Sequence, residues 1–254
     1  MIAKKVMFAV GIMLIAAIGG FAQTKPGTIA SLEFQKLKPG TARQYEDGRK
    51  AQAEWHKQQK HTAPLYIWET RSGDDTGTYI VGRLGQHWAD FDRPAAEDKG
   101  ELEAYEKNVG GYVESLIDRF YELLPKESKP TDSMTPSKFS EIITYVVKSG
   151  KSEEFHSAIS RANEAIEKTK WPVHYYWYVL ANGGRAGTYV LVIPHDNWAD
   201  FEDNPNMKPF AEMLSEAFGH AEADSILNRF DTSTEMTTSS ILEFRADLSY
   251  LPGK

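Results

Sequence analysis

The chain has 254 residues, carries 29 Lys and Arg against 36 Asp and Glu, and contains no cysteine. Disulfide frameworks, cysteine-ligated metals and catalytic thiols are therefore excluded. The formal net charge of −7 offers no basic surplus for binding phosphates, which argues against a nucleic-acid-binding protein, and 41% hydrophobic residues predict a folded chain with a packed core.

The N-terminus has the pattern of a secretory signal peptide. Two lysines precede an apolar run over residues 6–18, and Gly20 and Ala22 then form an A-x-A-like cleavage site. The run is shorter than the ~20 residues that a membrane-spanning helix needs, so a cleaved signal is favoured over an uncleaved anchor. We expect residues 1–22 to be removed and the protein to be exported to the periplasm or the cell exterior, without membrane attachment.

The rest of the chain repeats itself. Gly-Thr-Tyr begins at Gly77 and again at Gly187, and Trp-Ala-Asp-Phe begins at Trp88 and again at Trp198, so both echoes are 110 residues apart. Solenoid repeats are much shorter, at ~20 to 50 residues. The long period therefore indicates two tandem copies of a small domain.

A third echo extends the register. Leu-Ile-Asp-Arg-Phe over residues 116–120 stands 110 residues before Ile-Leu-Asn-Arg-Phe over residues 226–230, which predicts that the two copies align without a gap through these strings. Residues 125–136 are rich in proline and small polar residues and have the composition of a linker. The predicted domains are residues 23–130 and residues 131–254.

Hydrophobic periodicity predicts the elements of the first copy. They are a strand over 28–37, a helix around 42–55, a hairpin whose strands begin at Leu65 and Gly77, and a helical region over 102–120.

The second copy repeats this order more clearly. It has a β-branched and aromatic strand over 138–147, an apolar helical stripe over 155–166, a hairpin over 175–191, a helical region over 207–230 and a last strand over 240–245. The duplicated Trp-Ala-Asp-Phe strings lie at the corner between the third strand and the second helical region. We expect their tryptophans to brace this corner and their aspartates to cap it.

The order strand, helix, strand, strand, helix, strand is the split βαβ arrangement of the ferredoxin-like fold. Two helices then cover one face of each four-stranded antiparallel sheet, and the second copy is the natural cover for the other face. The predicted fold class is α+β, with two tandem ferredoxin-like βαββαβ units that form a pseudo-dimeric α+β barrel within one chain.

In element order and duplication, residues 28–251 resemble the dimeric α+β barrel superfamily, and Trp-Ala-Asp-Phe is their most distinctive short string. This superfamily includes antibiotic-biosynthesis monooxygenases, NIPSNAP-type proteins and haem-degrading or stress-responsive relatives. The resemblance implies a small-molecule cavity between the helices and the sheet of a unit, and nothing narrower.

Aromatic residues crowd the hairpin strands of both copies. Strand alternation sends Tyr176 and Tyr178 to one face and Tyr175 and Trp177 to the other. The rings either fill a core between the units or line a pocket for a flat or apolar ligand, with tyrosine hydroxyls, a histidine or an arginine to orient it. The predicted ligand-binding residues are Tyr66, Trp68, Tyr79, Arg83, His174, Tyr176, Tyr178 and Tyr189.

None of the seven histidines has a histidine partner at the 110-residue offset, so the copies do not share a catalytic histidine. His56 and His61 are five residues apart, which places them on different faces of a helix and disfavours a shared metal. Metal, nucleotide and nucleophile-elbow motifs are absent from the sequence. The sequence therefore predicts neither a metal nor a cofactor, and it assigns no catalytic residue.

Three functional hypotheses remain. The first is an exported small-molecule-binding or scaffold protein, and the second is a cofactor-independent, monooxygenase-like enzyme that acts on an aromatic or polyketide-like molecule. The third is a haem-handling protein, which needs a histidine such as His174 facing the cavity. The expected partners are a small apolar or aromatic ligand and a second copy of the chain, in a homodimer of pseudo-dimers.

Overall fold

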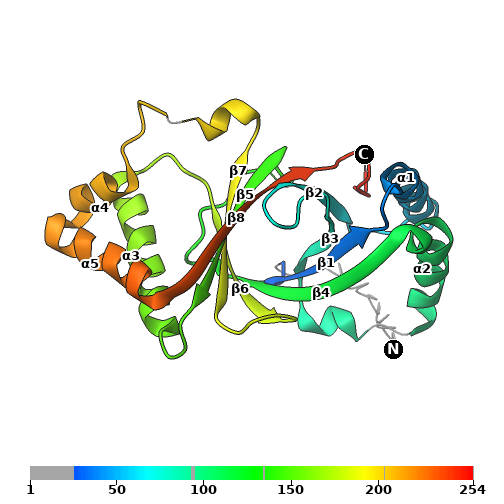
Figure 1. The fold of residues 1–254 in the computed structure, drawn as a ribbon, viewed down its shortest axis with the longest axis horizontal. Helices are drawn as coiled ribbons and strands as arrows, with labels where there is room; N and C mark the ends of the chain where they lie inside the picture. Colours follow the sequence, from blue (N-terminus) through cyan, green and yellow to red (C-terminus); the bar gives the residue numbers. More distant parts are fainter. Residues whose placement is uncertain (1–25, 93–94, 134, 203, 254) are drawn as a thin grey trace, which may run out of the picture.

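The structure is a computed structural model that describes residues 26–92, 95–133, 135–202 and 204–253. The predicted signal peptide lies outside the described residues. Eight strands close into one antiparallel barrel in the order β1-β3-β2-β8-β5-β7-β6-β4 (Figure 1).

Each half of the barrel is a ferredoxin-like unit. The first contains β1 (Ile29–Leu37), α1 (Ala42–Gln58), β2 (Tyr66–Ser72), β3 (Tyr79–Gln86), the short helix η1 (Trp88–Phe91), α2 (Ala95–Asn108), the short helix η2 (Gly110–Tyr112) and β4 (Val113–Leu123). The second contains β5 (Phe139–Val147), α3 (Ser152–Thr169), β6 (Tyr176–Asn182), β7 (Thr188–His195), η3 (Trp198–Phe201), α4 (Phe210–Phe218), α5 (His220–Ser233) and β8 (Thr234–Phe244).

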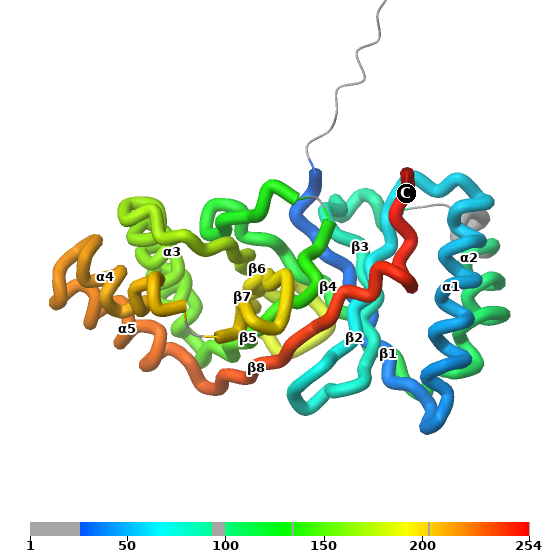
Figure 2. Tube along the Cα trace, turned by 90° about the horizontal axis from the view of Figure 1, so that it is seen from above, coloured from blue at the N-terminus to red at the C-terminus, as the bar shows by residue number. Residues whose placement is uncertain are grey.

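Two seams join the units edge to edge. Strand β2 pairs with β8, and β4 pairs with β6, both antiparallel. Each unit thereby supplies hydrogen-bond partners for the edge strands of the other unit, which would otherwise be exposed. The helices cover the outer faces at opposite ends of the molecule, with α1 and α2 at one end and α3, α4 and α5 at the other (Figures 1 and 2). The predicted pseudo-dimeric α+β barrel is therefore confirmed.

Side chains from both units fill the inside of the barrel. Tyr178 packs with Ala30 and Tyr121 in one cluster, and Trp68 packs with Phe244 in another. Barrels of eight strands have an interior that side chains can fill, and here aromatic rings provide much of that volume. The expected strand alternation is confirmed for this strand. Tyr178 lies inside the barrel, whereas Tyr175 and Trp177 belong to the core between the sheet and the helices.

The duplicated corner also follows the prediction. The Asp90 carboxylate accepts a hydrogen bond from the backbone N–H of His87 at 2.8 Å, and the Asp200 carboxylate accepts one from Asp196 at 2.8 Å. Trp88 packs against Phe120 and Trp198 against Phe139, with ring centroids 5.4 and 4.5 Å apart.

The expected ungapped register is wrong in its last part. Ile29 pairs with Glu122 and Phe139 with Glu243, separations of 93 and 104 residues, so the second unit is eleven residues longer between its first and last strands. The string at 116–120 lies in β4, whereas its supposed partner at 226–230 lies in α5. Five residues that mix apolar and polar side chains suit either a strand or a helix, and packing decides between them.

The predicted helical region over 102–120 is correct as far as the end of α2 and wrong over the residues of β4, for the same reason. Helix α2 ends at Asn108, and the last strand of the second unit begins at Thr234, earlier than predicted. The second unit therefore has two helices where the first has one. Within the described ranges, none of the helices has the length and apolar character that crossing a bilayer requires.

Candidate functional site

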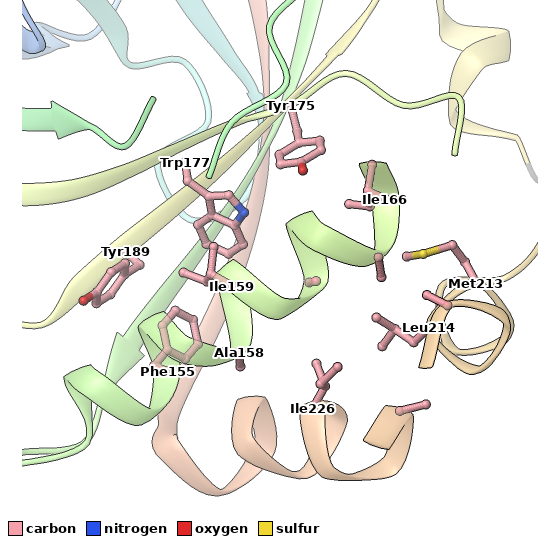
Figure 3. Close-up of a cluster of buried hydrophobic side chains, with 14 of the residues drawn as sticks. Phe155, Ala158, Ile159, Ile166, Tyr175, Trp177, Tyr189, Met213, Leu214 and Ile226 are labelled. Atoms are coloured by element: carbon pink, nitrogen blue, oxygen red, sulfur yellow. The ribbon is translucent and has the colours of Figure 1, made fainter. Parts of the chain in front are cut away.

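The two units differ most in the layer between their helices and their sheet. In the second unit this layer is an apolar core, in which α3 packs against the strands and against α4 and α5 (Figure 3). Phe155, Ile159 and Ile166 of α3 are at most 5% exposed, and the other buried residues of this helix are alanines. This half of the molecule has the packing expected of a structural core.

The first unit has polar side chains at the matching positions of α1. Arg49, Gln52 and His56 stand 110 residues before Ile159, Ala162 and Ile166, and they are 3%, 3% and 2% exposed. On the facing strand, Glu33 and Gln35 replace Ile143 and Tyr145. A buried polar group is more informative than a buried apolar one, because it lowers stability unless a partner satisfies it.

A hydrogen-bond network satisfies most of these groups. Gln35 Oε1 accepts from Tyr45 OH at 2.7 Å and from Arg49 Nη2 at 2.6 Å, and Arg49 Nε donates to Tyr45 OH at 3.0 Å. The Gln35 amide donates to Glu33 Oε1 and to Tyr105 OH, the latter at 3.3 Å. The buried Arg49 guanidinium therefore positions Glu33 indirectly, through the hydrogen bonds of Gln35.

Burial raises the pKa of the Glu33 carboxyl above its ordinary value, and the Arg49 guanidinium opposes this shift. Asp118, directly opposite Glu33 on β4, adds a smaller shift in the same direction as burial. Burial also raises the pKa of Tyr105 to about 12. Glu33 consequently holds a proton more strongly than an exposed glutamate does.

An open hollow of about 270 Å³ lies over the outer face of β3, β1 and β4. Its charged lining residues are Glu33, Arg83, Asp118 and Arg119, and its aromatic ones are Phe91 and Phe120. Pockets for small molecules combine apolar walls with a few polar groups that fix orientation. The hollow has this character, and its volume suits a compact ligand.

A chain of ionisable groups runs from the hollow to the surface. Arg83 Nη2 donates to Glu101 Oε1, and the same oxygen lies 3.8 Å from His56 Nε2. The Nδ1 atoms of His56 and His61 are 2.8 Å apart. His56 also stacks on Tyr250, with ring centroids at 5.4 Å.

Burial lowers the pKa of His56 to about 4, so its ring is neutral at pH 7. Burial by itself would raise the pKa of Glu101, but Arg83 and the histidines outweigh it and the pKa is lowered. Arg83 and Glu101 therefore form an ion pair at neutral pH. No group of three or more His, Asp or Glu side chains within the described residues is arranged to hold a metal ion.

The structure distributes the eight predicted ligand-binding residues over several environments. Arg83 alone lines the hollow of the first unit. Tyr66, Trp68 and Tyr178 belong to the clusters inside the barrel. Tyr176 lies near the linker, where its hydroxyl is 3.1 Å from Thr131 Oγ1.

The remaining three residues lie elsewhere. Tyr79 packs on Tyr45, with ring centroids at 4.6 Å, and donates to Glu46 at 2.7 Å. Tyr189 belongs to the core of the second unit, beside a shallow hollow. His174 is exposed, with Nδ1 3.0 Å from the carbonyl oxygen of Pro130, so it does not face a cavity as the haem hypothesis requires.

The polar network of α1 is absent from the sequence-based prediction. The signal that could have found it is the duplication itself, because four positions carry charged or polar residues in one copy and isoleucine or alanine in the other. They are Glu33, Arg49, Gln52 and His56. Periodicity alone does not show that a helix position is buried, so these residues do not stand out in one copy taken by itself.

No family model matches the sequence, and curated proteins give no match. Solved structures do match over most of the chain. A candidate monooxygenase of Lactobacillus acidophilus NCFM has 10% identity and a TM-score of 0.53, covering 90% of this chain and 97% of its own. An anthrone oxidase-like protein has 11% identity and a TM-score of 0.53, covering 89% and 94%.

A mutant chlorite dismutase from Candidatus Nitrospira defluvii has 8% identity and a TM-score of 0.51, covering 88% of this chain and 93% of its own. Identities this low establish the fold and leave the chemistry open. The fold is that of the dimeric α+β barrel proteins, with both halves of the barrel in one chain.

Proposed function

We propose that this protein binds a small, flat molecule with polar substituents in the hollow of the first unit. The observation that supports the proposal is that the first unit has charged residues at positions where the second unit has apolar ones. Glu33 and Arg83 project from the sheet where the second unit has Ile143 and Ile193. A fold that needed only a core would be served by the apolar residues, so the charged ones point to a ligand.

The names of the similar structures support the same proposal, since monooxygenase, anthrone oxidase-like protein and chlorite dismutase all denote proteins that act on small molecules. The aromatic walls of the hollow favour an aromatic body, and the carboxylates favour a ligand with hydroxyl groups.

Thermal shift against aromatic and polyketide-like compounds tests the proposal. A ligand at 100 times its dissociation constant adds ~2.7 kcal/mol of stability. Arg83→Ile, which introduces the residue of the second unit, is expected to abolish the shift, whereas Trp68→Phe inside the barrel is expected to preserve it. The reverse result would place the ligand inside the barrel, and a flat response to every compound would overturn the proposal.

A second candidate function is catalysis of the monooxygenase type, and Glu33 is the observation that favours it. Its half-buried carboxyl lines the hollow, and burial raises its pKa above the ordinary value, which makes it a stronger general base for removing a phenolic proton. Oxygen consumption with a bound hydroxyanthrone is the assay. Glu33→Gln is expected to keep binding and lose oxygen consumption, and a wild-type protein that binds the compound without consuming oxygen would exclude this candidate.

We also propose that the protein is exported, on the strength of the two lysines, the apolar run and the small residues that precede Gln23. N-terminal sequencing of the protein purified from its natural host is expected to begin at Gln23. A chain that retains residues 1–22 in the cytoplasmic fraction would contradict export. Light scattering on the same material tests the proposed homodimer.

A further inference from the structure

Glu101 and His56, which lie behind Arg83, support a more specific inference about the ligand. This inference rests on the proposed function. We propose that the ligand is an anion whose carboxylate replaces Glu101 on Arg83, and that Glu101 then binds His56, which takes up one proton. The site would thus exchange one ion pair for two.

Arg83 is the natural anchor for such an anion. It lines the hollow and is 28% exposed, while its guanidinium is held on one side by Glu101. A guanidinium binds carboxylates in a planar, bidentate manner, and an incoming ligand carboxylate offers the same chemistry as Glu101. The second unit has Ile193 at this position, so the fold does not require the pair.

His56 is the group that would receive Glu101. Its side chain is 2% exposed, and its Nε2 atom has no hydrogen-bond partner among the described residues. The contact between the Nδ1 atoms of His56 and His61 requires one hydrogen between them. When His61 supplies that hydrogen, His56 carries its own proton on Nε2, directed at Glu101 3.8 Å away. A carboxylate movement of about 1 Å would make this a normal hydrogen bond.

The surrounding charges explain why proton uptake follows binding. Glu101 from α2, Arg83 from β3, Arg49 from α1 itself and His61 after α1 act on His56, and Tyr250 stacks on its ring. While Arg83 holds Glu101, burial, His61 and two nearby guanidinium groups keep His56 neutral. Once the ligand anion neutralises Arg83, the released carboxylate stabilises the imidazolium form of His56.

The proton has a defined route. His61 is half-buried: water first supplies a proton to its Nε2 atom, and the resulting imidazolium then passes its Nδ1 proton across 2.8 Å to Nδ1 of His56, which leaves His61 neutral. The balance is one proton from solvent for each anion bound, with no other bond formed or broken. Each anion then faces a cation: the ligand faces Arg83, and Glu101 faces His56.

Isothermal titration calorimetry tests this with 2-naphthoate and its neutral analogue 2-naphthamide, at pH 7 in two buffers of different ionisation enthalpy. We expect naphthoate to bind with uptake of close to one proton, and its affinity to fall by up to tenfold per unit of rising pH. Naphthamide is expected to bind more weakly, without proton uptake.

Two variants separate this mechanism from a structural role. His56→Gln keeps a hydrogen-bond donor that does not titrate, so binding should persist while proton uptake disappears. Glu101→Gln removes the carboxylate that competes for Arg83, so naphthoate should bind more tightly than to wild type and without uptake. Unchanged melting temperatures without ligand would show that both variants fold, and the ring resonances of His56 should report protonation only in the naphthoate complex.

The failures are distinguishable. Equal binding of naphthoate and naphthamide without proton uptake, or weaker naphthoate binding by Glu101→Gln, would overturn the exchange and leave the binding site standing. If neither compound nor any member of the thermal-shift set binds, the proposed function fails, and the exchange fails with it.

Discussion

Arg49 provides a test of whether the polar layer of the first unit is a single coupled network. Its guanidinium is 3% exposed and bonds to Gln35 and Tyr45, while Gln35 connects it to Glu33. Arg49→Ile introduces the residue that the second unit has at the matching position, Ile159. The variant leaves the half-buried Glu33 carboxyl without the cation that acts on it most strongly.

Removing one partner of a buried ion pair costs about 3–5 kcal/mol. Glu33 is half-buried and reaches Arg49 only through Gln35, so we expect a smaller loss, about 2 kcal/mol. Glu33→Ile and Arg49→Ile together remove both charges and restore the apolar residues of the second unit, so the double variant should lose at most about 1 kcal/mol. The two substitutions are therefore expected to be strongly non-additive.

Urea unfolding at pH 7, followed by tryptophan fluorescence, measures these changes. Both units share one closed barrel, so we expect a single transition with an unchanged slope against denaturant. Lys50→Ile, an exposed substitution on the same helix, is the control and should change the unfolding free energy by less than about 0.5 kcal/mol. A double variant that costs the sum of the single ones would refute the coupling between Glu33 and Arg49.

Three further predictions concern the two cores and a seam of the barrel. Phe155→Ala is expected to cost about 3–5 kcal/mol in urea unfolding, because the ring is fully buried, and a loss below about 1 kcal/mol would contradict the packing of the second unit. The unfolded chain binds a proton at His56 near pH 6.5 but the folded chain only near pH 4, so the unfolding free energy of wild type should fall by about 3 kcal/mol as the pH falls across this window. His56→Ile should lack this fall when unfolding is measured at several pH values. Parallel pH dependences of the two proteins would contradict the prediction. A Cβ at Gly183 would lie 2.2 Å from the carbonyl oxygen of Asp118 at the seam between β6 and β4, whereas one at Gly150 meets nothing within 4 Å. Both have positive φ, so Gly150→Ala should cost about 1 kcal/mol and Gly183→Ala clearly more, and equal melting temperatures for the two variants would refute the close approach.

The fold could be predicted because the duplication presents most elements twice, in two different sequences. The apolar stripe of α3, for example, identified the weaker stripe of α1 as a helix at the same place. The prediction failed at residues 116–120, where a short string resembled one in the other copy by composition and not by structure. Strand pairing between β1 and β4 decides that these residues form a strand, and no local pattern contains that information.

The candidate site could be predicted less well. Arg83 lines the hollow, but the aromatic residues predicted with it divide between the inside of the barrel and the two helix-covered faces. Alternation along a strand separates two faces and does not say which face is enclosed by a second unit. The residues behind Arg83 were missed because a polar residue in a helical pattern is usually exposed, and burial becomes visible only when the sheet is in place.

The sequence by itself determined the element order, the internal duplication and the acidic, cysteine-free character of the chain, since periodicity, repetition and composition are local properties. Only the tertiary structure decided that the two sheets close through β2 with β8 and β4 with β6. It also decided that Glu33 of β1 and Glu101 of α2 meet Arg49 and His56 of α1, although the three elements are separate in the chain. Contacts of this kind depend on long-range packing. A buried charge is stabilised by the groups around it, and only the tertiary structure brings those groups together.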